Sequence, residues 1–281
     1  MKIYFRLILI TFIVGISIQA FANSDVYPWL TQYHEKHTIE NRIAVPDGYQ
    51  RINAEQDSFQ YWLRYLPLKQ KQSAVYLYNG EKKDNQNAHA AVIDIDVGGT
   101  DLQQCSDAVI RLKAEYLYSK GDSKAIHFNF SSGDNASFEA WTEGYRPIVS
   151  GNNVKWQKQA GQDHSYSNFK KYLNTVFMYA GTFSLNRELQ KISINEMEIG
   201  DIFIQGGFPG HAVIVVDMAV HQKTGRKLFL LAQSYMPAQD IHVLKNPMNK
   251  AFSPWYEVTF GKELQTPEWT FQKEHLKRFK F

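Results

Sequence analysis

The chain contains one cysteine, Cys105, so it cannot form an intramolecular disulfide bond. Its fold must therefore be held together by the burial of apolar side chains and by hydrogen bonds. The composition allows this, since 44% of the 281 residues are hydrophobic and 14% are aromatic, which is enough for a packed core. The lone thiol also raises a chemical question, because a free cysteine is either a small buried hydrophobe or a nucleophile.

The position of Cys105 is compatible with a nucleophile and with a small buried hydrophobe. Apolar residues recur at steps of three and four after the Gly98-Gly99 pair, which predicts a helix from Asp101 to Lys120. Cys105 lies in the first turn of this helix, where unpaired backbone N–H groups and the positive end of the helix dipole favour thiolate over thiol. It also belongs to the apolar stripe, so burial alone explains it. A nucleophile is predicted only if the fold brings a base to the sulfur.

The first residues have the pattern of an export signal. Lys2 and Arg6 precede an apolar stretch, and Ala20-Phe21-Ala22 is a small-x-small cleavage site. We therefore expect a signal peptide at residues 1–22 and a periplasmic or secreted bacterial location. The alternative is a retained N-terminal anchor, but the apolar stretch is shorter than the roughly 20 residues that a membrane-spanning helix needs. No stable membrane span is expected once the leader is removed.

Charge and residue spacing restrict the partners. The formal net charge of +3 includes Lys2 and Arg6, so the chain without the leader carries +1. This balance, with no dense basic stripe, argues against nucleic acid as a partner. No compact spacing of metal ligands is present, so neither a metal nor another cofactor is predicted.

The sequence shows no internal repeat and no long linker, which predicts one α+β domain over residues 23–281. We divide it into an N-terminal extension (23–90), a core (91–244) and a C-terminal extension (245–281). Helices are predicted at Asp101–Lys120 and Tyr166–Ala180. Strands are predicted at 74–78, 91–97, 125–130, 201–205, 211–220, 227–235 and 240–244. The closely spaced strands indicate helices packed on a mainly antiparallel sheet.

His211 is the candidate base. Among the nine histidines, it alone lies between a glycine-rich turn and a long β-branched run. The alternation of a strand places His211, Val213, Val215 and Asp217 on one face. A histidine at the start of a strand is more often structural than catalytic, so this interpretation requires a thiol beside it.

A third group on the next strand could orient the imidazole. If the hairpin turn is centred near residue 222, His211 faces Gln233, whereas a tighter turn favours Gln239. Asp217 is a further alternative. A glutamine amide can accept the imidazole N–H and fix its tautomer, although a polar residue that ends a core strand describes Gln233 equally well.

Four features occur in a known order. Gln104-Cys105 opens a helix, Gly200-Asp201-Ile202-Phe203 and Pro209-Gly210-His211-Ala212-Val213 follow, and the next strand ends in a polar residue. This order resembles the papain-like CHAP and NlpC/P60 amidases and peptidases. The resemblance covers roughly residues 91–244, with a long insertion between the helix and the histidine strand. It implies a papain-like core with the thiol-bearing helix packed on the sheet.

The resemblance also implies an activity, that of an exported cysteine hydrolase acting on a peptide or a peptidoglycan-like cell-wall stem. Cys105 would attack an amide carbonyl, and His211, oriented by Gln233, would protonate the leaving group. The backbone N–H of Cys105, with Gln104 or Gln103, would stabilise the oxyanion. An amide at the third position departs from the pattern of these enzymes, in which a carboxylate, histidine or asparagine is usual.

Three aromatic residues of the insertion, Trp141, Tyr145 and Trp156, are candidates for a substrate-binding groove. Packing inside the core or against a loop is the commoner role for such residues. The sequence leaves open whether the substrate is a peptide, a cell-wall stem or an ester, and whether the reaction is hydrolysis or transfer.

A second resemblance covers most of the mature chain. The segments Tyr179-Ala180-Gly181-Thr182, 233–239 and Thr266-Pro267-Glu268-Trp269 resemble an uncharacterised bacterial exported family, domain of unknown function 4846. This resemblance implies no activity. The competing hypothesis is therefore a non-catalytic exported binding or scaffold module in which Cys105 is buried and inert.

Overall fold

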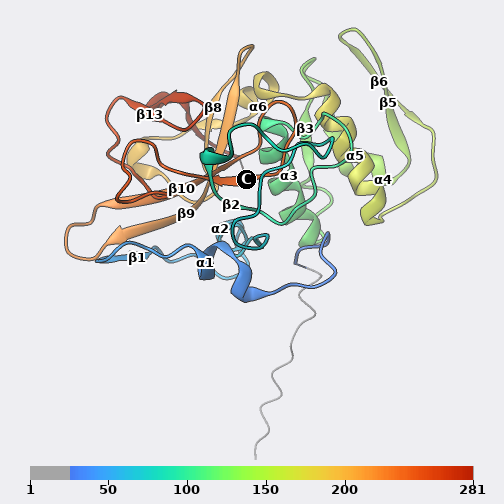
Figure 1. Ribbon diagram of the computed structural model, residues 1–281. Coiled ribbons are helices and arrows are strands. Elements are labelled where there is room, and N and C mark those ends of the chain that lie inside the picture. Colours follow the sequence, from blue (N-terminus) through green and yellow to red (C-terminus); the bar gives the residue numbers. More distant parts are fainter. Residues whose placement is uncertain (1–25, 281) are drawn as a thin grey trace, which may run out of the picture.

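The computed structural model describes residues 26–280. The predicted signal peptide, residues 1–22, lies outside the described residues. The fold is mixed α+β, with helices on a central sheet whose strand pairs are all antiparallel among the described residues (Figure 1). The prediction of an α+β chain with a mainly antiparallel sheet is confirmed.

The central sheet has nine strands in the order β2-β11-β10-β9-β8-β15-β7, with β1 paired to β9 and β12 paired to β10. Its strands come from both predicted extensions as well as from the predicted core, so all three segments build one sheet. The bounds are β1 Tyr49–Arg51, β2 His89–Val92, β7 Gln190–Lys191, β8 Ile202–Gln205, β9 His211–His221, β10 Lys227–Gln233, β11 His242–Leu244, β12 Tyr256–Glu257 and β15 Leu276–Arg278.

Three two-stranded ribbons lie outside this sheet. One of them, β5-β6, belongs to the insertion and projects from the body beside α4 and α5 (Figure 1). Another, β13-β14, lies in the C-terminal segment and packs against β8. The bounds are β3 His127–Asn129, β4 Asn135–Ser137, β5 Tyr145–Ser150, β6 Asn153–Lys158, β13 Glu263–Gln265 and β14 Thr270–Gln272.

The two predicted helices correspond to α3 and α5. Within residues 26–280, no helix has both the length and the apolar character that crossing a membrane requires. The α-helices are α1 Ile39–Arg42, α2 Phe59–Arg64, α3 Cys105–Ser119, α4 Phe138–Thr142, α5 Tyr166–Tyr179 and α6 Thr182–Glu188. Short 3₁₀ turns are η1 Glu35–His37, η2 Gln86–Ala88, η3 Ile194–Glu196 and η4 Lys273–His275.

Helix α3 begins later than the sequence predicts, at Cys105 instead of Asp101. The residue before it, Gln104, is the N-cap, and its backbone N–H donates to the Asp107 carboxylate at 3.1 Å. A carboxylate in the first turn satisfies a backbone donor and interacts favourably with the helix dipole. Cys105 is therefore the first residue of the helix.

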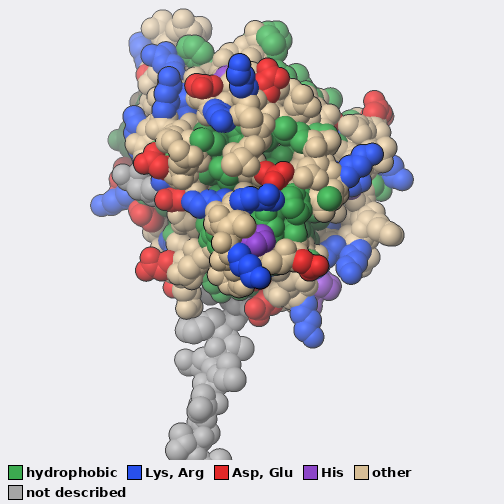
Figure 2. Space-filling view, turned by 90° about the vertical axis from the view of Figure 1, so that its left-hand side faces the viewer, with side chains coloured by type: hydrophobic (Ala, Val, Ile, Leu, Met, Phe, Trp, Pro, Cys, Tyr) green, Lys and Arg blue, Asp and Glu red, His purple; other side chains and the backbone are tan. Residues whose placement is uncertain are grey.

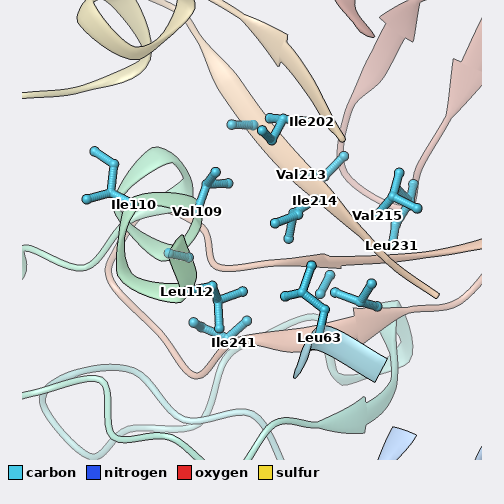
Figure 3. Packing of buried hydrophobic residues seen from close by; sticks show 14 of the residues in the cluster. Leu63, Val109, Ile110, Leu112, Ile202, Val213, Ile214, Val215, Leu231 and Ile241 are labelled. Atoms are coloured by element: carbon cyan, nitrogen blue, oxygen red, sulfur yellow. The ribbon is translucent and has the colours of Figure 1, made fainter. Parts of the chain in front are cut away.

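The core lies between α3 and the strands β8, β9 and β10. Figure 3 shows Val109 and Leu112 of α3 on the side of the helix that faces Ile202 and Ile214 of the sheet. These side chains are buried. Packing between a helix face and a sheet face of this kind excludes water and fixes the position of the helix on the sheet.

A bulge in the β9-β10 pair changes the expected alternation. Leu230 pairs with Asp217, but the next residue, Leu231, pairs with Val215. The expectation that Asp217 continues the row of His211 is therefore wrong, because an extra residue in a strand breaks the period of two. Asp217 instead binds Arg51 Nε at 2.6 Å and Arg64 Nε at 2.7 Å.

We expect Asp217→Asn to destabilise the fold by about 3 kcal/mol, because it removes the buried carboxylate that Arg51 and Arg64 share and leaves them only the partly exposed Glu40 carboxylate, at 3.0 and 3.5 Å. The Asp217 side chain is 0% exposed, so water cannot replace it. Urea unfolding followed by circular dichroism measures the change. In the control, Glu139→Gln, the lost ion pair with Lys124 is exposed, and the expected change is within about 0.5 kcal/mol. Equal effects of the two substitutions would contradict the prediction.

Candidate functional site

A pocket of about 580 Å³ opens where α3 begins, where β9 begins and where β10 ends. Cys105 and His211 both line it, although they lie far apart in the sequence. The end of α5 and the glycine-rich turn between β8 and β9 complete the wall. The lining of the pocket includes Gln104, Cys105, Asp107, Phe177, Met178, Phe208, His211, Tyr235, Met236 and Trp269.

The Cys105 sulfur lies beside the start of β9. Backbone N–H groups of Ala212, Ser106 and Cys105 itself stabilise its anionic form and lower its pKa. Because Ala212 directly follows His211, the helix N-terminus and the start of this strand meet at the sulfur.

The thiol is nevertheless neutral at physiological pH. Cys105 is only 8% exposed, and burial raises its pKa to about 11, with a further rise from the Asp107 carboxyl group. The backbone N–H groups favour the thiolate, as expected from the first turn of a helix, but desolvation of the charged form outweighs them here. Burial also raises the pKa of Asp107 well above its usual value.

His211 is buried in an aromatic setting and bonded at one nitrogen. It is 1% exposed, and its ring centroid lies 4.8 Å from that of Tyr235 and 5.3 Å from that of Trp269. Its Nε2 is 2.8 Å from Gln233 Oε1. Burial lowers the pKa of His211 to about 4, although the Gln233 hydrogen bond raises it. The imidazole is therefore neutral at pH 7.

The contact between His211 and Gln233 is made by a different register from the one expected. Lys227 pairs with Val220, so the hairpin turn is centred beyond residue 222. The pairing of Ala232 with Ile214 then puts Gln233 beside Val213, diagonal to His211. Long side chains reach diagonal neighbours across a sheet, and the glutamine does so here.

The other candidates for the third position do not bond to His211, and the side-chain Oε1 of Gln239 is buried without a hydrogen-bond partner among the described residues. Asp217 binds the two arginines described above. Gln239 is buried, and its backbone carbonyl accepts from the Ser234 hydroxyl at 2.8 Å. Of the three candidates, Gln233 is the one that bonds to His211 in this structure.

A carboxylate from the C-terminal segment binds the far side of Gln233. Gln233 Nε2 donates to Glu268 Oε2 at 2.8 Å, and Lys83 forms an ion pair with the same carboxylate. Gln233 Nε2 also lies 3.5 Å from His242 Nε2. The sequence analysis did not identify Glu268 as a site residue, and its only signal was its place in the segment Thr266-Pro267-Glu268-Trp269.

In the comparison with protein families, the family described as "Domain of unknown function (4846)", DUF4846, matches residues 39–278. The chain belongs to this family. The resemblance to DUF4846 that the sequence suggested is thus confirmed, whereas the comparisons give no support to a papain-like core. Searches of curated proteins and of solved structures gave no match.

The aromatic wall of the pocket in this DUF4846 chain differs from the predicted one. Phe177, Phe208, Tyr235 and Trp269 line the pocket. Sequence analysis missed them because a loop aromatic has no periodicity that shows what it faces, and because Phe177 belongs to the apolar stripe of α5.

The aromatic residues that the sequence suggested lie elsewhere in the described part of the chain. Trp141 is buried in α4, where its ring N–H donates to Asn168 Oδ1 at 2.9 Å and the Arg146 guanidinium lies 3.8 Å from its ring centroid. Tyr145 and Trp156 belong to the β5-β6 ribbon. Their positions favour packing of the insertion over a role in the pocket.

Gln104 lines the pocket, but its backbone N–H is bonded to Asp107 and its side-chain amide donates to Asp101 at 3.1 Å. The Gln103 side-chain oxygen accepts from Arg111 at 2.8 Å. These bonds direct both residues to the support of the helix N-terminus. The Cys105 backbone N–H faces the sulfur of its own side chain.

Charge around the body is mixed. Figure 2 shows Lys and Arg side chains interspersed with Asp and Glu on the face that it displays. The described residues contain no group of three or more His, Cys, Asp or Glu side chains suited to hold a metal ion.

We expect acid to destabilise this fold through its buried histidines. The pKa of His211 falls to about 4 and that of His242 to about 3, in both cases mainly through burial, against 6.5 in an unfolded chain. The unfolded chain therefore binds more protons below pH 6.5, and stability is lost as the pH falls from 6.5 toward 4. Each histidine accounts for about 2 to 3 kcal/mol between pH 7.5 and 4.5.

Urea unfolding at these two pH values checks this expectation. His242→Gln should lose less stability between pH 7.5 and 4.5 than the parent protein does, whatever its stability at pH 7.5. His164→Gln, on an exposed loop, should keep the parent's pH dependence. An unchanged pH dependence in His242→Gln would refute the assignment.

Proposed function

We propose that this protein is an exported cysteine hydrolase with a papain-like core that cleaves an amide bond in a peptide or a cell-wall stem. Cys105 is the nucleophile, His211 the base and Gln233 the residue that orients the base. The observation that carries the proposal is that Cys105 and His211 line one pocket while Gln233 accepts from the far nitrogen of the imidazole. A nucleophile, a base and a group that orients the base are the three parts that this kind of catalysis needs.

The reaction starts from a neutral thiol and a neutral imidazole. As the Cys105 sulfur attacks the carbonyl carbon, the thiol proton moves to His211 Nδ1, so a free thiolate never accumulates in the buried site. Collapse of the tetrahedral intermediate forms a thioester and expels the amine, which takes its proton from the imidazolium. His211 then accepts a proton from the water that attacks the thioester, and collapse of this second intermediate releases the acid and the Cys105 sulfur, which takes the proton back from His211. Gln233 Oε1 stabilises the imidazolium at each stage.

The N-terminus of α3 supports the oxyanion. The helix has 15 residues, and its first N–H groups point toward the sulfur of its own first residue. Backbone donors that already point toward a developing negative charge need no reorganisation during the reaction. This favours acyl chemistry at the sulfur.

The apolar mouth of the pocket supports a substrate with a bulky apolar group beside the cleaved bond. Phe208 is 96% exposed, and Met178 and Met236 are also exposed. All three line the pocket together with the aromatic residues described above. Exposed apolar side chains gathered at one pocket indicate a binding surface.

A specific observation favours the competing function. The raised pKa and low exposure of Cys105 are also those of an inert buried cysteine. Under this alternative, the protein is an exported binding or scaffold module, and the apolar pocket holds a ligand without reacting with it.

Alkylation separates the two functions, and Cys105 is the only thiol, so any label reports on it. At pH 7 we expect His211→Ala to slow labelling by iodoacetamide by about 100-fold, since general bases typically contribute that much or more. Near pH 11 hydroxide ionises the thiol in both proteins, and the rates should converge. His164→Ala is the control. Equal rates for the parent and His211→Ala at pH 7 would favour the inert module.

Hydrolysis of a panel of fluorogenic peptide amides tests the substrate class. We expect Phe208→Ser combined with Met236→Ser to raise KM about 10-fold or more for substrates with an apolar group beside the bond, since each exposed apolar contact is worth about 1 kcal/mol. kcat should change little, because neither side chain touches the reacting atoms. Phe183→Ser, at an exposed position outside the pocket lining, is the control. A fall in kcat with unchanged KM would contradict the proposed binding role.

A further inference from the structure

We infer that Glu268 is a positioning residue that fixes the orientation of the Gln233 amide and, through it, the tautomer of His211. Its meaning for catalysis rests on the proposed function, but its effect on the imidazole does not. The structural basis is a chain of hydrogen bonds from the C-terminal segment to the start of β9.

A glutamine cannot orient a histidine unaided. The two ends of its amide have almost the same shape, so rotation by half a turn exchanges an acceptor for a donor. If Gln233 presented its NH₂ group to His211, the imidazole would carry its proton on Nδ1. The nitrogen available to the thiol would then be protonated and could not act as a base.

Two groups on the far side of Gln233 decide the orientation. The Glu268 carboxylate lies 2.8 Å from Gln233 Nε2 and, when ionised, it can only accept a hydrogen bond. The Gln233 oxygen at that position would face a negative charge. The carboxylate therefore selects the orientation in which the NH₂ group points away from His211, and a charge-assisted bond of this kind is among the stronger ones.

His242 favours the same orientation. Its Nδ1 lies 2.8 Å from the backbone carbonyl of Asp240, which can only accept, so the proton of the neutral ring is on Nδ1. Its Nε2, 3.5 Å from Gln233 Nε2, is then an acceptor. Both groups on the far side thus require a donor from Gln233.

The orientation of the Gln233 amide determines the tautomer of His211, the candidate base. With its NH₂ group turned away, Gln233 presents Oε1 to His211, and the imidazole must donate from Nε2. The neutral ring then has its lone pair on Nδ1. This is the tautomer that a base acting on Cys105 needs.

Lys83 keeps the carboxylate in place in a partly buried setting. It forms an ion pair with Glu268, and its ammonium lies 5.3 Å from the Tyr235 ring centroid. The side chains of Lys83 and Glu268 are only 8% and 15% exposed. The pair offsets the cost of a lone carboxylate next to the aromatic residues around His211.

The test is nitrogen NMR of protein labelled with ¹⁵N-histidine at pH 7, in which the His211 signals are identified by their loss in His211→Gln. We expect His211 to be almost entirely in the Nε2–H form in the parent protein and in a mixture of both tautomers in Glu268→Gln, whose own amide can accept or donate. In the same variant, labelling of Cys105 should slow in proportion to the lost fraction of the Nε2–H tautomer, which is about 2-fold for an equal mixture. Glu263→Gln, the same substitution in an exposed part of the same ribbon, should leave both unchanged.

Two further variants exclude a merely structural effect. Lys83→Met removes the ion pair but keeps the acceptor, and we expect it to keep the Nε2–H tautomer. The exchange of Gln233→Glu with Glu268→Gln places the group that can only accept directly against His211, and it should restore that tautomer. An unchanged His211 tautomer in Glu268→Gln, or no restoration in the exchange variant, would overturn the inference.

These outcomes are separate from those of the proposed function. A shifted tautomer in Glu268→Gln, together with labelling that does not depend on His211, would leave the positioning role intact and refute the hydrolase.

Discussion

The packing of α3 across β9 is the constraint on which the candidate site depends. The two elements are far apart in the sequence, and their buried side chains bring the first residue of the helix to the first residues of the strand. Because a packed core resists small displacements, the sulfur and the imidazole have fixed positions in the lining of one pocket. The glycine-rich turn before β9 is tightly packed, since Gly210 lies so close to Gly207 and Thr182 that a side chain would not fit there.

The same burial sets the chemistry. An exposed thiol at a helix N-terminus ionises easily, but this one is enclosed, and desolvation favours the neutral form of both the cysteine and the histidine. A site of two neutral partners can act only if proton transfer and bond formation occur together. It also needs the unprotonated imidazole nitrogen on the correct side, because no excess of thiolate compensates for a wrong tautomer. Orientation of His211 therefore matters more here than it would in a preformed ion pair.

The sequence predicted the elements that carry strong periodicity, and it predicted the fold class. Helices α3 and α5 and strands β8 to β11 were expected close to where they lie, because their apolar residues repeat with the period of a helix or follow one another in β-branched runs. The bulge that separates Asp217 from the row of His211 could not be predicted, since it depends on the pairing partner and leaves no mark in composition. Short strands such as β7, β12 and β15 are stabilised by their neighbours in the sheet, and their own residues give too weak a signal.

Only part of the candidate site could be predicted from the sequence. His211 and Gln233 were selected because each stands at the end of a strong strand pattern, although the register that joins them differs from the expected one. Glu268, Trp269 and Lys83 come from segments on either side of the predicted core, and only the three-dimensional fold brings them to the imidazole. The sequence gives the identity of each residue. The hydrogen-bond partners of a buried group come from segments that are distant in the sequence, and local periodicity does not predict which segments meet. The surroundings of His211 therefore combine core residues, Gln233 and Tyr235, with residues of both predicted extensions.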